Sequence, residues 1–399
     1  MSGGGLAYDV LVVGAGPAGS AVAAALAASG RDVLLVEARR HPRPKACAEY
    51  ASPRIAEELR RLRMPDAAWQ SNAHPLLGMR VIRGADAVQI GYHDANGPRT
   101  AWGLDRRTFD AALAAHAVSI GAHLRERSSL EGLFWRDGRV IGAHLRTADG
   151  PADVACRTLI GADGARSRVA QLLGVERPVR RPRRLGMVAH YEGIPELSDH
   201  GEMHVGPGWY VGLAPVPDGS INVGMAVPLD GTSQAASRRP AEERFEAAIA
   251  GIPAVAARLA GKQRLTAIRG ASPIGHRVSR AAGPGWMLIG DAAGFIDPFT
   301  GEGIYRALRS ARAAAEALAA GQDGAAERYL DARRAAFAAK DALTWLVQGM
   351  LAAPPLMGYT LRRLAERPSL AARLGSALGD CRPASDALSP AFLAQVLRP

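Results

Sequence analysis

The segment from Gly290 to Gly303 has the residue types and spacing that most clearly suggest a chemistry, and it reads Gly-Asp-Ala-Ala-Gly-Phe-Ile-Asp-Pro-Phe-Thr-Gly-Glu-Gly. The apolar residues 286–289 before it predict a buried strand, and the Ala-, Leu- and Arg-rich residues 304–320 after it predict a helix. A strand that ends in Asp291, followed by a glycine-lined loop and a helix N-terminus, can hold a polyhydroxyl chain together with an electron-poor ring. A flavin consists of these two parts.

A second glycine motif, Gly14-Ala15-Gly16-Pro17-Ala18-Gly19, lies near the N-terminus. Residues 8–13 predict a β-branched strand, residues 20–29 a small-residue helix, and residues 31–36 a second strand that ends at Glu37. This order is the βαβ dinucleotide unit, in which glycines let a pyrophosphate approach the helix N-terminus. Glu37 would accept hydrogen bonds from a ribose 2′-hydroxyl. This favours a cofactor whose adenosine ribose is not phosphorylated, such as FAD or NAD.

Two shorter motifs complete the pattern. Residues 161–168 (Gly-Ala-Asp-Gly-Ala-Arg-Ser-Arg) follow an apolar strand at 156–160, and residues 105–110 (Asp-Arg-Arg-Thr-Phe-Asp) precede a predicted helix at 111–120. Together the four motifs resemble the FAD-dependent oxidoreductases that include aromatic hydroxylases, flavin halogenases and geranylgeranyl reductases, whose fold is that of p-hydroxybenzoate hydroxylase. The resemblance extends from about residue 8 to about residue 320 and is weak between about 178 and 264.

This resemblance implies a place around FAD for each motif. Asp291 would bond a ribityl hydroxyl, with capping of the next turn as its structural alternative. Residues 298–303 would follow the pyrimidine edge of the ring, where the following helix stabilises the reduced anion. Asp163 and Arg106 would flank the pyrophosphate and ribityl chain, although Arg106 could instead be a surface charge. The expected FAD contacts are Gly14, Gly16, Pro17, Ala18, Gly19, Glu37, Ala38, Arg39, Lys45, Cys47, Ala48, Arg106, Asp163, Gly164, Gly290, Asp291, Pro298, Gly301, Glu302, Gly303 and Ile304.

Cys47 is the first catalytic candidate. It lies in Pro-Lys-Ala-Cys-Ala-Glu-Tyr, residues 44–50, which is similar to the Lys-x-Cys-Gly-(Gly/Glu) stretch that geranylgeranyl reductases and some related monooxygenases carry near the reactive edge of the flavin. Ala48 replaces the glycine of that stretch. A thiol at this position could donate a proton to a reduced double bond. The alternative is that Cys47 is a small buried residue without a chemical role.

The expected substrate wall separates the subfamilies further. Residues 210–215 read Tyr-Val-Gly-Leu-Ala-Pro, where geranylgeranyl reductases have Tyr-x-Trp-x-Phe-Pro and tryptophan halogenases have Trp-x-Trp-x-Ile-Pro. Because positions 210, 212 and 214 share one face of a strand, Gly212 and Ala214 leave this wall without two large side chains. The departure argues strongly against a halogenase and moderately against a reductase. Tyr210, the second catalytic candidate, and Trp209 could contact substrate or fill the core.

Composition limits the remaining classes. The chain has 399 residues, 48% of them hydrophobic, and a formal net charge of +11, which suits two or three interleaved domains with a large core. We do not expect a nucleic-acid partner, because the arginines are spread along the chain and only Lys45, Lys262 and Lys340 are lysines. The three cysteines form no paired pattern, which predicts a reducing cytosol and no metal site.

The predicted fold is α/β (α+β overall), with a Rossmann-like FAD-binding domain, an interleaved β-sheet substrate domain and C-terminal helices. We assign residues 1–75, 105–178 and 265–340 to the FAD-binding domain, residues 76–104 and 179–264 to the substrate domain, and residues 341–399 to the C-terminal helices. The strands expected in the substrate domain are 79–82, 87–90, 185–190, 202–205, 209–215 and 220–227. One helix at 242–259 is expected to pack on this sheet.

Two enzymatic hypotheses follow. In the favoured one, NAD(P)H reduces FAD and oxygen then hydroxylates a hydrophobic aromatic or polyketide-like substrate, as the Asp-Pro-Phe at 297–299 and the open wall suggest. In the alternative, reduced FAD passes hydride to an isoprenoid C=C bond, and a proton comes from Cys47 or water. A redox-silent flavoprotein is a remote third hypothesis. It is disfavoured because the loop expected to face the flavin ring is complete.

The partners expected are a hydrophobic small molecule and an electron donor. The sequence shows no second Rossmann unit for a nicotinamide nucleotide, so NAD(P)H would bind transiently over the same groove, or a protein such as a ferredoxin would supply the electrons. The apolar stretch at 343–357 suggests either packing of a terminal helix or contact with a greasy substrate or a membrane surface. No stretch reaches the roughly 18 apolar residues of a membrane span, so a cytoplasmic or membrane-peripheral protein is expected.

Overall fold

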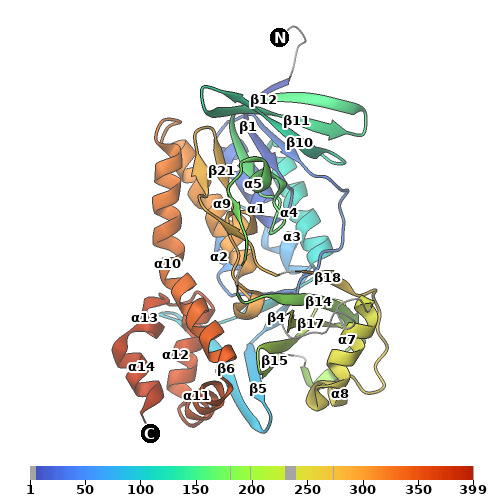
Figure 1. The fold of residues 1–399 in the computed structure, drawn as a ribbon, viewed down its shortest axis with the longest axis vertical. Helices are drawn as coiled ribbons and strands as arrows, with labels where there is room; N and C mark the ends of the chain where they lie inside the picture. The colour runs from blue at the N-terminus through green and yellow to red at the C-terminus, as the bar shows by residue number, and fades with distance from the viewer. Residues whose placement is uncertain (1–5, 180, 198, 230–239, 273, 399) are drawn as a thin grey trace.

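The computed structural model describes residues 6–179, 181–197, 199–229, 240–272 and 274–398 (Figure 1). A mixed sheet with its helices forms the upper part of the molecule in Figure 1, a second sheet lies below it, and the C-terminal helices pack beside the second sheet. The predicted mixed α/β class with parallel and antiparallel strands is confirmed.

Parallel strands form the centre of the first sheet, whose order is β10-β11-β12-β1-β2-β9 with β21 beside β12. These parallel strands are β1 (Leu6–Val13), β2 (Val33–Val36), β9 (His123–Arg125), β12 (Gly150–Gly161) and β21 (Trp286–Leu288). Antiparallel strands extend the sheet at β12 and β21, namely β10 (Ser129–Arg136), β11 (Arg139–Thr147) and β20 (Ala282–Gly283). The central strands are buried, which matches their continuous runs of Val, Leu and Ile.

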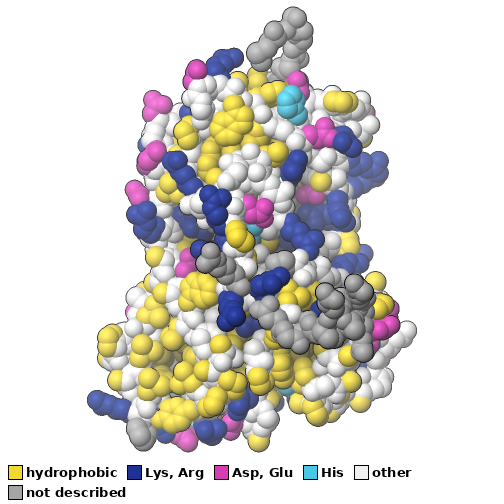
Figure 2. Space-filling model, in the orientation of Figure 1, with side chains coloured by type: hydrophobic (Ala, Val, Ile, Leu, Met, Phe, Trp, Pro, Cys, Tyr) yellow, Lys and Arg dark blue, Asp and Glu magenta, His cyan; other side chains and the backbone are white. Residues whose placement is uncertain are grey.

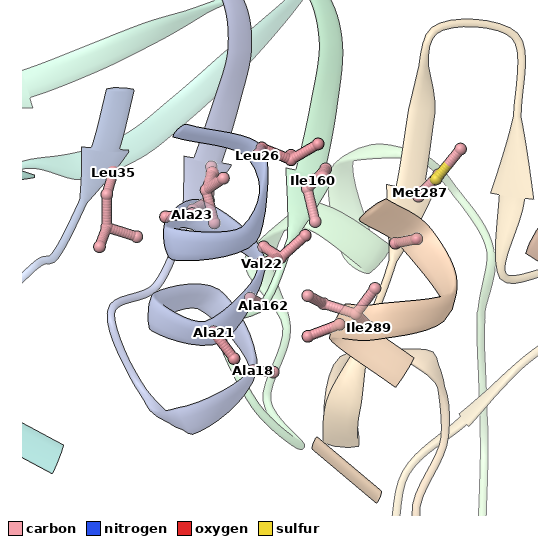
Figure 3. Close-up of a cluster of buried hydrophobic side chains, with 14 of the residues drawn as sticks. Ala18, Ala21, Val22, Ala23, Leu26, Leu35, Ile160, Ala162, Met287 and Ile289 are labelled. Carbon is pink, nitrogen blue, oxygen red and sulfur yellow. The ribbon is translucent and has the colours of Figure 1, made fainter. Parts of the chain in front are cut away.

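Helix α1 (Pro17–Ala28) packs against this sheet and lies between two further helices, α4 (Arg106–Ile120) and α9 (Gly303–Ala319). The buried face of α1 consists of small side chains. In Figure 3, Ala18, Ala21 and Val22 point toward the strands and toward the segment around Ile289. Small side chains let a helix lie close to a sheet, so the turn before α1 is drawn close to the ends of the strands.

The second sheet is mostly antiparallel, with the order β18-β14-β17-β16-β15-β5-β6-β7. Its strands are β5 (Gly78–Arg83), β6 (Asp86–Asp94), β7 (Gly97–Arg99), β14 (Arg184–Tyr191), β15 (His200–Gly206), β16 (Trp209–Pro215), β17 (Ile221–Pro228) and β18 (Arg269–Ala271). The single helix expected at 242–259 is wrong. Two helices, α7 (Ala241–Ala250) and α8 (Pro253–Leu259), lie there, because Pro253 cannot continue a helix but suits the first turn of a new one.

The connections between the sheets carry shorter elements. A small three-stranded sheet has the order β3-β8-β4. Its strands are β3 (Tyr50–Ala51), β4 (Ala73–Leu76) and β8 (Ala101–Leu104). The short helices nearby are α2 (Ile55–Arg61), α3 (Asp66–Gln70) and α5 (Arg168–Leu172). Since β3 directly follows Cys47 along the chain, this small sheet holds one end of the loop that carries the thiol.

The C-terminal part is helical and broken by prolines, as its sequence predicts. Its helices are α10 (Ala325–Ala352), α11 (Pro354–Glu366), α12 (Pro368–Leu378), α13 (Ser385–Leu388) and α14 (Pro390–Leu397). Residue 340, where we place the end of the FAD-binding domain, lies inside α10, so one helix belongs to both parts. Figure 2 shows hydrophobic side chains over much of the lower part of this face, where these helices lie. No helix in the described part of the chain is both long and apolar enough to cross a bilayer.

Candidate active site

The turn at Gly14–Gly19 has the shape that a dinucleotide requires. Gly14 has φ +102°, and a Cβ there would lie 2.6 Å from the carbonyl oxygen of Ala162. A Cβ on Gly19 would lie 1.8 Å from the carbonyl oxygen of Gly14. Gly16, in contrast, faces open space, and no side chain caps the N-terminus of α1. The helix therefore presents unpaired N–H groups to an open space in which a pyrophosphate fits.

Glu37 closes this turn from the end of β2. The side chain is buried, and its carboxylate accepts hydrogen bonds from the backbone N–H of Ala15 (3.1 Å) and of Arg39 (3.0 Å). Arg43 forms an ion pair with the same carboxylate at 3.2 Å. A carboxylate has about four lone-pair positions, so Glu37 can brace the glycine turn and still accept a ribose hydroxyl. Ala38 and Arg39 are exposed beside it.

Asp291 is the freest carboxylate in the candidate flavin site. It starts a short 3-10 turn after β21, and its side chain makes no hydrogen bond to the described part of the chain. The capping role that we considered is thus not formed. The neighbouring Gly290 has φ +58°, and its N–H donates to Ser310 Oγ at 2.8 Å. A free acid held at the end of a strand by a rigid turn suits a ribityl hydroxyl.

Asp297 fixes the loop that precedes α9. It is buried, and its carboxylate accepts hydrogen bonds from Phe299 N–H (3.1 Å) and from the hydroxyl of Tyr210 (2.7 Å). Arg184 pairs with the second oxygen at 2.6 Å. The structure therefore places Tyr210 in the core, with its hydroxyl committed to Asp297. Desolvation, followed by the Asp297 charge, raises the pKa of Tyr210 well above its usual value.

The side chain of Glu302 points away from this loop. It is buried, and its carboxylate contacts Lys340 (3.3 Å), Thr344 (3.3 Å) and Arg306 (3.7 Å). The side chain of Glu302 is thus committed to the C-terminal helix, so the cofactor contact that we predicted for Glu302 would have to come from its backbone. At Gly303 an added Cβ would meet only open space.

Asp163 and Gly164 lie at the expected end of β12. The Asp163 carboxylate accepts hydrogen bonds from Ser167 Oγ (2.6 Å) and from Val169 N–H (3.1 Å), so it holds the start of α5. Burial raises the pKa of Asp163. Its side chain supports the loop that packs under Gly14, which makes its contribution to a cofactor site indirect.

Cys47 is half-buried beside a buried arginine. Arg106 donates from Nη1 to Cys47 Sγ at 3.2 Å, and from Nε and Nη2 to the two oxygens of Asp110, both at 2.8 Å. Arg106 is only 3% exposed, which excludes the surface-charge alternative. Burial alone would lower the pKa of Arg106, but the nearby Asp110 charge outweighs it and raises that pKa. The backbone N–H of Glu49 also donates to Cys47 Sγ, at 3.3 Å.

Glu49, His190 and Asn222 join this site, although we did not expect them from the sequence. Glu49 Oε2 lies 2.7 Å from His190 Nε2 and accepts a hydrogen bond from Asn222 Nδ2 at 2.9 Å. Glu49 Oε1 accepts from the backbone N–H of Arg106 at 3.2 Å. Burial would lower the pKa of His190, but Glu49 outweighs it and raises that pKa. Glu49 has φ +59°, so a carboxylate occupies a backbone position that favours glycine.

The second sheet faces the Cys47 loop. Asn222 Nδ2 donates to the carbonyl oxygen of Cys47 at 3.0 Å, and a Cβ on Gly224 would lie 2.9 Å from the Cβ of Ala48. Gly224 pairs with Gly212 across β17 and β16, so two adjacent wall positions carry no side chain. Gly212 therefore lies on the same sheet face as the Cys47 loop, and Ala48 of that loop covers the wall at the adjacent Gly224.

A cavity of about 370 Å³ opens beside this loop, between α4, β14 and the hairpin of β16 and β17. It is lined by Pro44, Lys45, Glu49, Asp105, Arg107, Val188, His190, Val216, Asp218, Ser220, Leu265, Thr266 and Arg269. The Glu49–His190 pair thus forms part of the cavity wall, and Cys47 lies directly behind it.

The glycine turns, the uncapped N-terminus of α1 and the free Asp291 fit FAD, and comparison with known proteins identifies the same class. A family model described as an FAD binding domain matches residues 7–340. The chain belongs to this family of FAD-binding flavoproteins, as the sequence motifs predicted, and it is an FAD-dependent oxidoreductase.

Named reductases are among its relatives. The chain is 34% identical over 330 residues to a menaquinone reductase of Mycolicibacterium smegmatis, with 78% of this chain and 76% of that protein covered. It is 31% identical over 319 residues to a digeranylgeranylglycerophospholipid reductase of Methanosarcina acetivorans, with 78% and 74% covered.

Solved structures share the fold over nearly the whole chain. A geranylgeranyl bacteriochlorophyll reductase-like protein of Thermoplasma acidophilum has a TM-score of 0.79 at 26% identity, with 99% of this chain and 97% of that chain covered. A flavin-dependent brominase has a TM-score of 0.82 at 20% identity, with 98% of each chain covered. At that identity, the likeness to the brominase concerns the fold alone.

Proposed function

We propose that this protein is a flavin-dependent reductase that saturates an isoprenoid C=C bond of a hydrophobic lipid, with NAD(P)H as the source of electrons. The observation that carries the proposal is the combination of Cys47, held by Arg106 in a loop that packs on Gly224, with a relationship above 30% identity to reductases of two isoprenoid lipids. Menaquinone and digeranylgeranylglycerophospholipid differ in their head groups, and the feature that they share is a chain of isoprene units.

In this reaction FAD, when bound and reduced by NAD(P)H, would supply hydride to one carbon of the double bond. The chain itself must then hold the alkene and supply a proton to the other carbon. Cys47 is the acid that we assign to that step, because its sulfur accepts hydrogen bonds from Arg106 and from Glu49 N–H and is thereby held in one position. The missing side chain at Gly224 lets Ala48 of the Cys47 loop pack directly on the second sheet, which holds the thiol from a second side.

Hydroxylation, which we favoured from the sequence, has less support. One argument for it was the Asp297-Pro298-Phe299 sequence. The structure gives Asp297 a structural role instead, since its carboxylate binds Arg184, Tyr210 and the N–H of the following turn. The other argument was the open wall, which accommodates an isoprenoid chain equally well. The exposed Trp345, Leu356 and Leu397 on the C-terminal helices suit a protein that collects its substrate from a lipid surface.

The test is the anaerobic reaction of the FAD-loaded protein with NADPH and either menaquinone or a geranylgeranyl-chain glycerolipid. Products are exposed to air before mass spectrometry, so that a merely reduced quinone ring returns to the quinone and only saturated C=C bonds keep their added hydrogens. A gain of two hydrogens per turnover supports the proposal. A product that gains one oxygen atom under air, with no hydrogenated product under nitrogen, would overturn it in favour of hydroxylation. Dithionite in place of NADPH separates a wrong donor from a wrong reaction.

A further inference from the structure

Three cationic side chains line the cavity beside the Cys47 loop, those of Lys45, Arg107 and Arg269. None of the three side chains makes a hydrogen bond or ion pair with a residue that the structure describes. They come from three separate parts of the chain: the loop before Cys47, the first turn of α4 and the start of β18. Unpaired arginines on a surface are common, but three unpaired cations around one cavity indicate an anionic ligand.

The carboxylates of the same cavity are already engaged. Asp105 accepts hydrogen bonds from Arg107 N–H (2.9 Å) and from Thr108 Oγ1 (2.8 Å), and so caps α4. Asp218 accepts from the N–H (2.9 Å) and the hydroxyl (2.6 Å) of Ser220. Glu49 binds His190 and Asn222. These hydrogen bonds hold the three carboxylates in place, while the side-chain N–H donors of the three cations have no partner in the described part of the chain.

The cavity has the dimensions and the position of a ligand site. Its volume of about 370 Å³ lies within the range of small-molecule sites, although at the lower end. His190 adds a fourth group that carries positive charge when protonated, and Glu49 raises its pKa. Because Glu49 also borders the Cys47 sulfur, a ligand anchored here would have its remaining part close to the proposed reaction centre.

We propose that this cavity is a phosphate site, in which Lys45, Arg107 and Arg269 bind the phosphoryl oxygens of a ligand that extends toward the Cys47 loop. Two sources can supply this chemistry. One is the diphosphate of the nicotinamide dinucleotide that reduces the flavin, and the other is the phosphodiester of a phospholipid substrate. The choice of source rests on the proposed function, whereas the phosphate site itself does not.

The first experiment is calorimetric titration of the FAD-loaded protein with inorganic pyrophosphate, at low and at moderate salt. We compare the wild type with Lys45→Gln, Arg107→Gln, Arg269→Gln and the triple variant. The matched control is Arg136→Gln, which removes an exposed arginine without a partner from the far end of β10. Each cavity substitution should weaken pyrophosphate binding about tenfold, because it removes a charge-assisted contact. The control should bind as the wild type does, and salt should weaken wild-type binding most.

The second experiment identifies the source. Anaerobic stopped-flow gives the NADPH concentration at half-maximal rate of flavin reduction, and steady-state assays give the KM for a phospholipid and for a phosphate-free quinone. If the triple variant needs more NADPH for half-maximal flavin reduction but keeps both KM values, the site belongs to the dinucleotide. If instead only its KM for the phospholipid rises, the site belongs to the lipid head group. Equal pyrophosphate binding by the wild type and the triple variant would overturn the phosphate site. If neither lipid is reduced but the pyrophosphate result holds, the proposed function fails and the site remains.

Discussion

The guanidinium of Arg106 lies 3.2 Å from the sulfur of Cys47, and the same guanidinium binds Asp110 through two parallel hydrogen bonds of 2.8 Å. A buried arginine that is already neutralised by a carboxylate can position a sulfur atom without placing a free charge in the core. The Cys47 loop is therefore attached to helix α4 through one side chain and to the second sheet through Asn222. The second sheet and helix α4 therefore meet at the loop that carries this thiol.

Replacing Cys47 by Ala should lower the rate of double-bond reduction roughly 100-fold, as is typical when a general acid is lost. Reduction of the flavin by NADPH should proceed at the wild-type rate, because that step needs no proton from Cys47. The two rates are measured separately by anaerobic stopped-flow and by product mass spectrometry. Cys381→Ala is the control, since Cys381 lies in the C-terminal part, between α12 and α13. Equal product rates for Cys47→Ala and wild type would show that water supplies the proton.

The glycine turn offers a matched pair of substitutions. Gly16→Ala adds a methyl group to open space, so the protein should fold while the methyl group obstructs a phosphate. Gly19→Ala places a Cβ 1.8 Å from the Gly14 carbonyl oxygen, so the βαβ unit itself must distort. We expect Gly16→Ala to keep its circular dichroism spectrum and lose most of its flavin absorbance. Gly19→Ala should lose both the native circular dichroism spectrum and the flavin absorbance. A Gly16→Ala protein that binds a full equivalent of FAD would contradict a phosphate position over Gly16.

Tyr210→Phe tests whether Tyr210 acts in catalysis or in packing. The substitution removes the hydrogen bond to Asp297 and should destabilise the protein by about 1 kcal/mol in urea unfolding. Turnover should stay within a factor of about three, because this hydroxyl is buried and committed to a structural carboxylate. A large loss of turnover without loss of stability would show that Tyr210 acts in catalysis, as the sequence analysis considered.

Local signals made most of the fold predictable. The strand–glycine–helix–strand order at 8–37 and the apolar strand before Gly290 appear at the expected places, because buried parallel strands and tight turns restrict residue type strongly. The split of the helix at 242–259 was missed, although Pro253 was the available signal. The continuous α10 was also missed, since no proline or glycine separates residue 340 from the residues on either side.

The site was harder to predict, because its partners lie far apart in the sequence. Glu49 and His190 are 141 residues apart, and Asp297 binds Tyr210 across 87 residues. A motif places Cys47 and Arg106 near a flavin, but it does not show that Arg106 contacts the sulfur. The sequence did contain one indication for Glu49. It occupies the last position of the Cys47 stretch, where related stretches have glycine or glutamate, and a charged residue that is buried there needs hydrogen-bond or charge partners.

The Glu49–His190 pair should make stability depend on pH. Because the folded pKa of His190 is raised above its unfolded value of about 6.5, the stabilisation is complete below that pH and is lost as pH rises through the folded pKa. Urea unfolding from pH 6 to pH 9 should show this decrease in the wild type, and His190→Asn should lack it. Glu49→Gln should cost roughly 1–3 kcal/mol at pH 6 and little at pH 9. An identical pH dependence in the wild type and His190→Asn would refute the assignment.

The buried Lys340 should be a major determinant of the position of the Glu302 loop. Its ammonium lies 2.8 Å from Asp380 and 3.3 Å from Glu302. Desolvation alone would lower the pKa of Lys340, but these two carboxylates outweigh it and raise that pKa. Lys340→Met leaves Asp380 without this cation and leaves Glu302 with Arg306 at 3.7 Å, and it should destabilise the protein by about 3–5 kcal/mol.

The double variant Lys340→Met/Asp380→Asn separates charge from packing. Asn tolerates the positive φ of +62° at position 380 and removes the carboxylate charge that Lys340→Met leaves there without a cation, so it should recover part of the lost stability. Flavin affinity should change in the same order, because Glu302 directly precedes the helix whose N-terminus faces the expected ring site. Additive losses in the double variant would mean that Lys340 acts through its backbone-carbonyl contacts at Ala377 and Leu378 instead of through its charge.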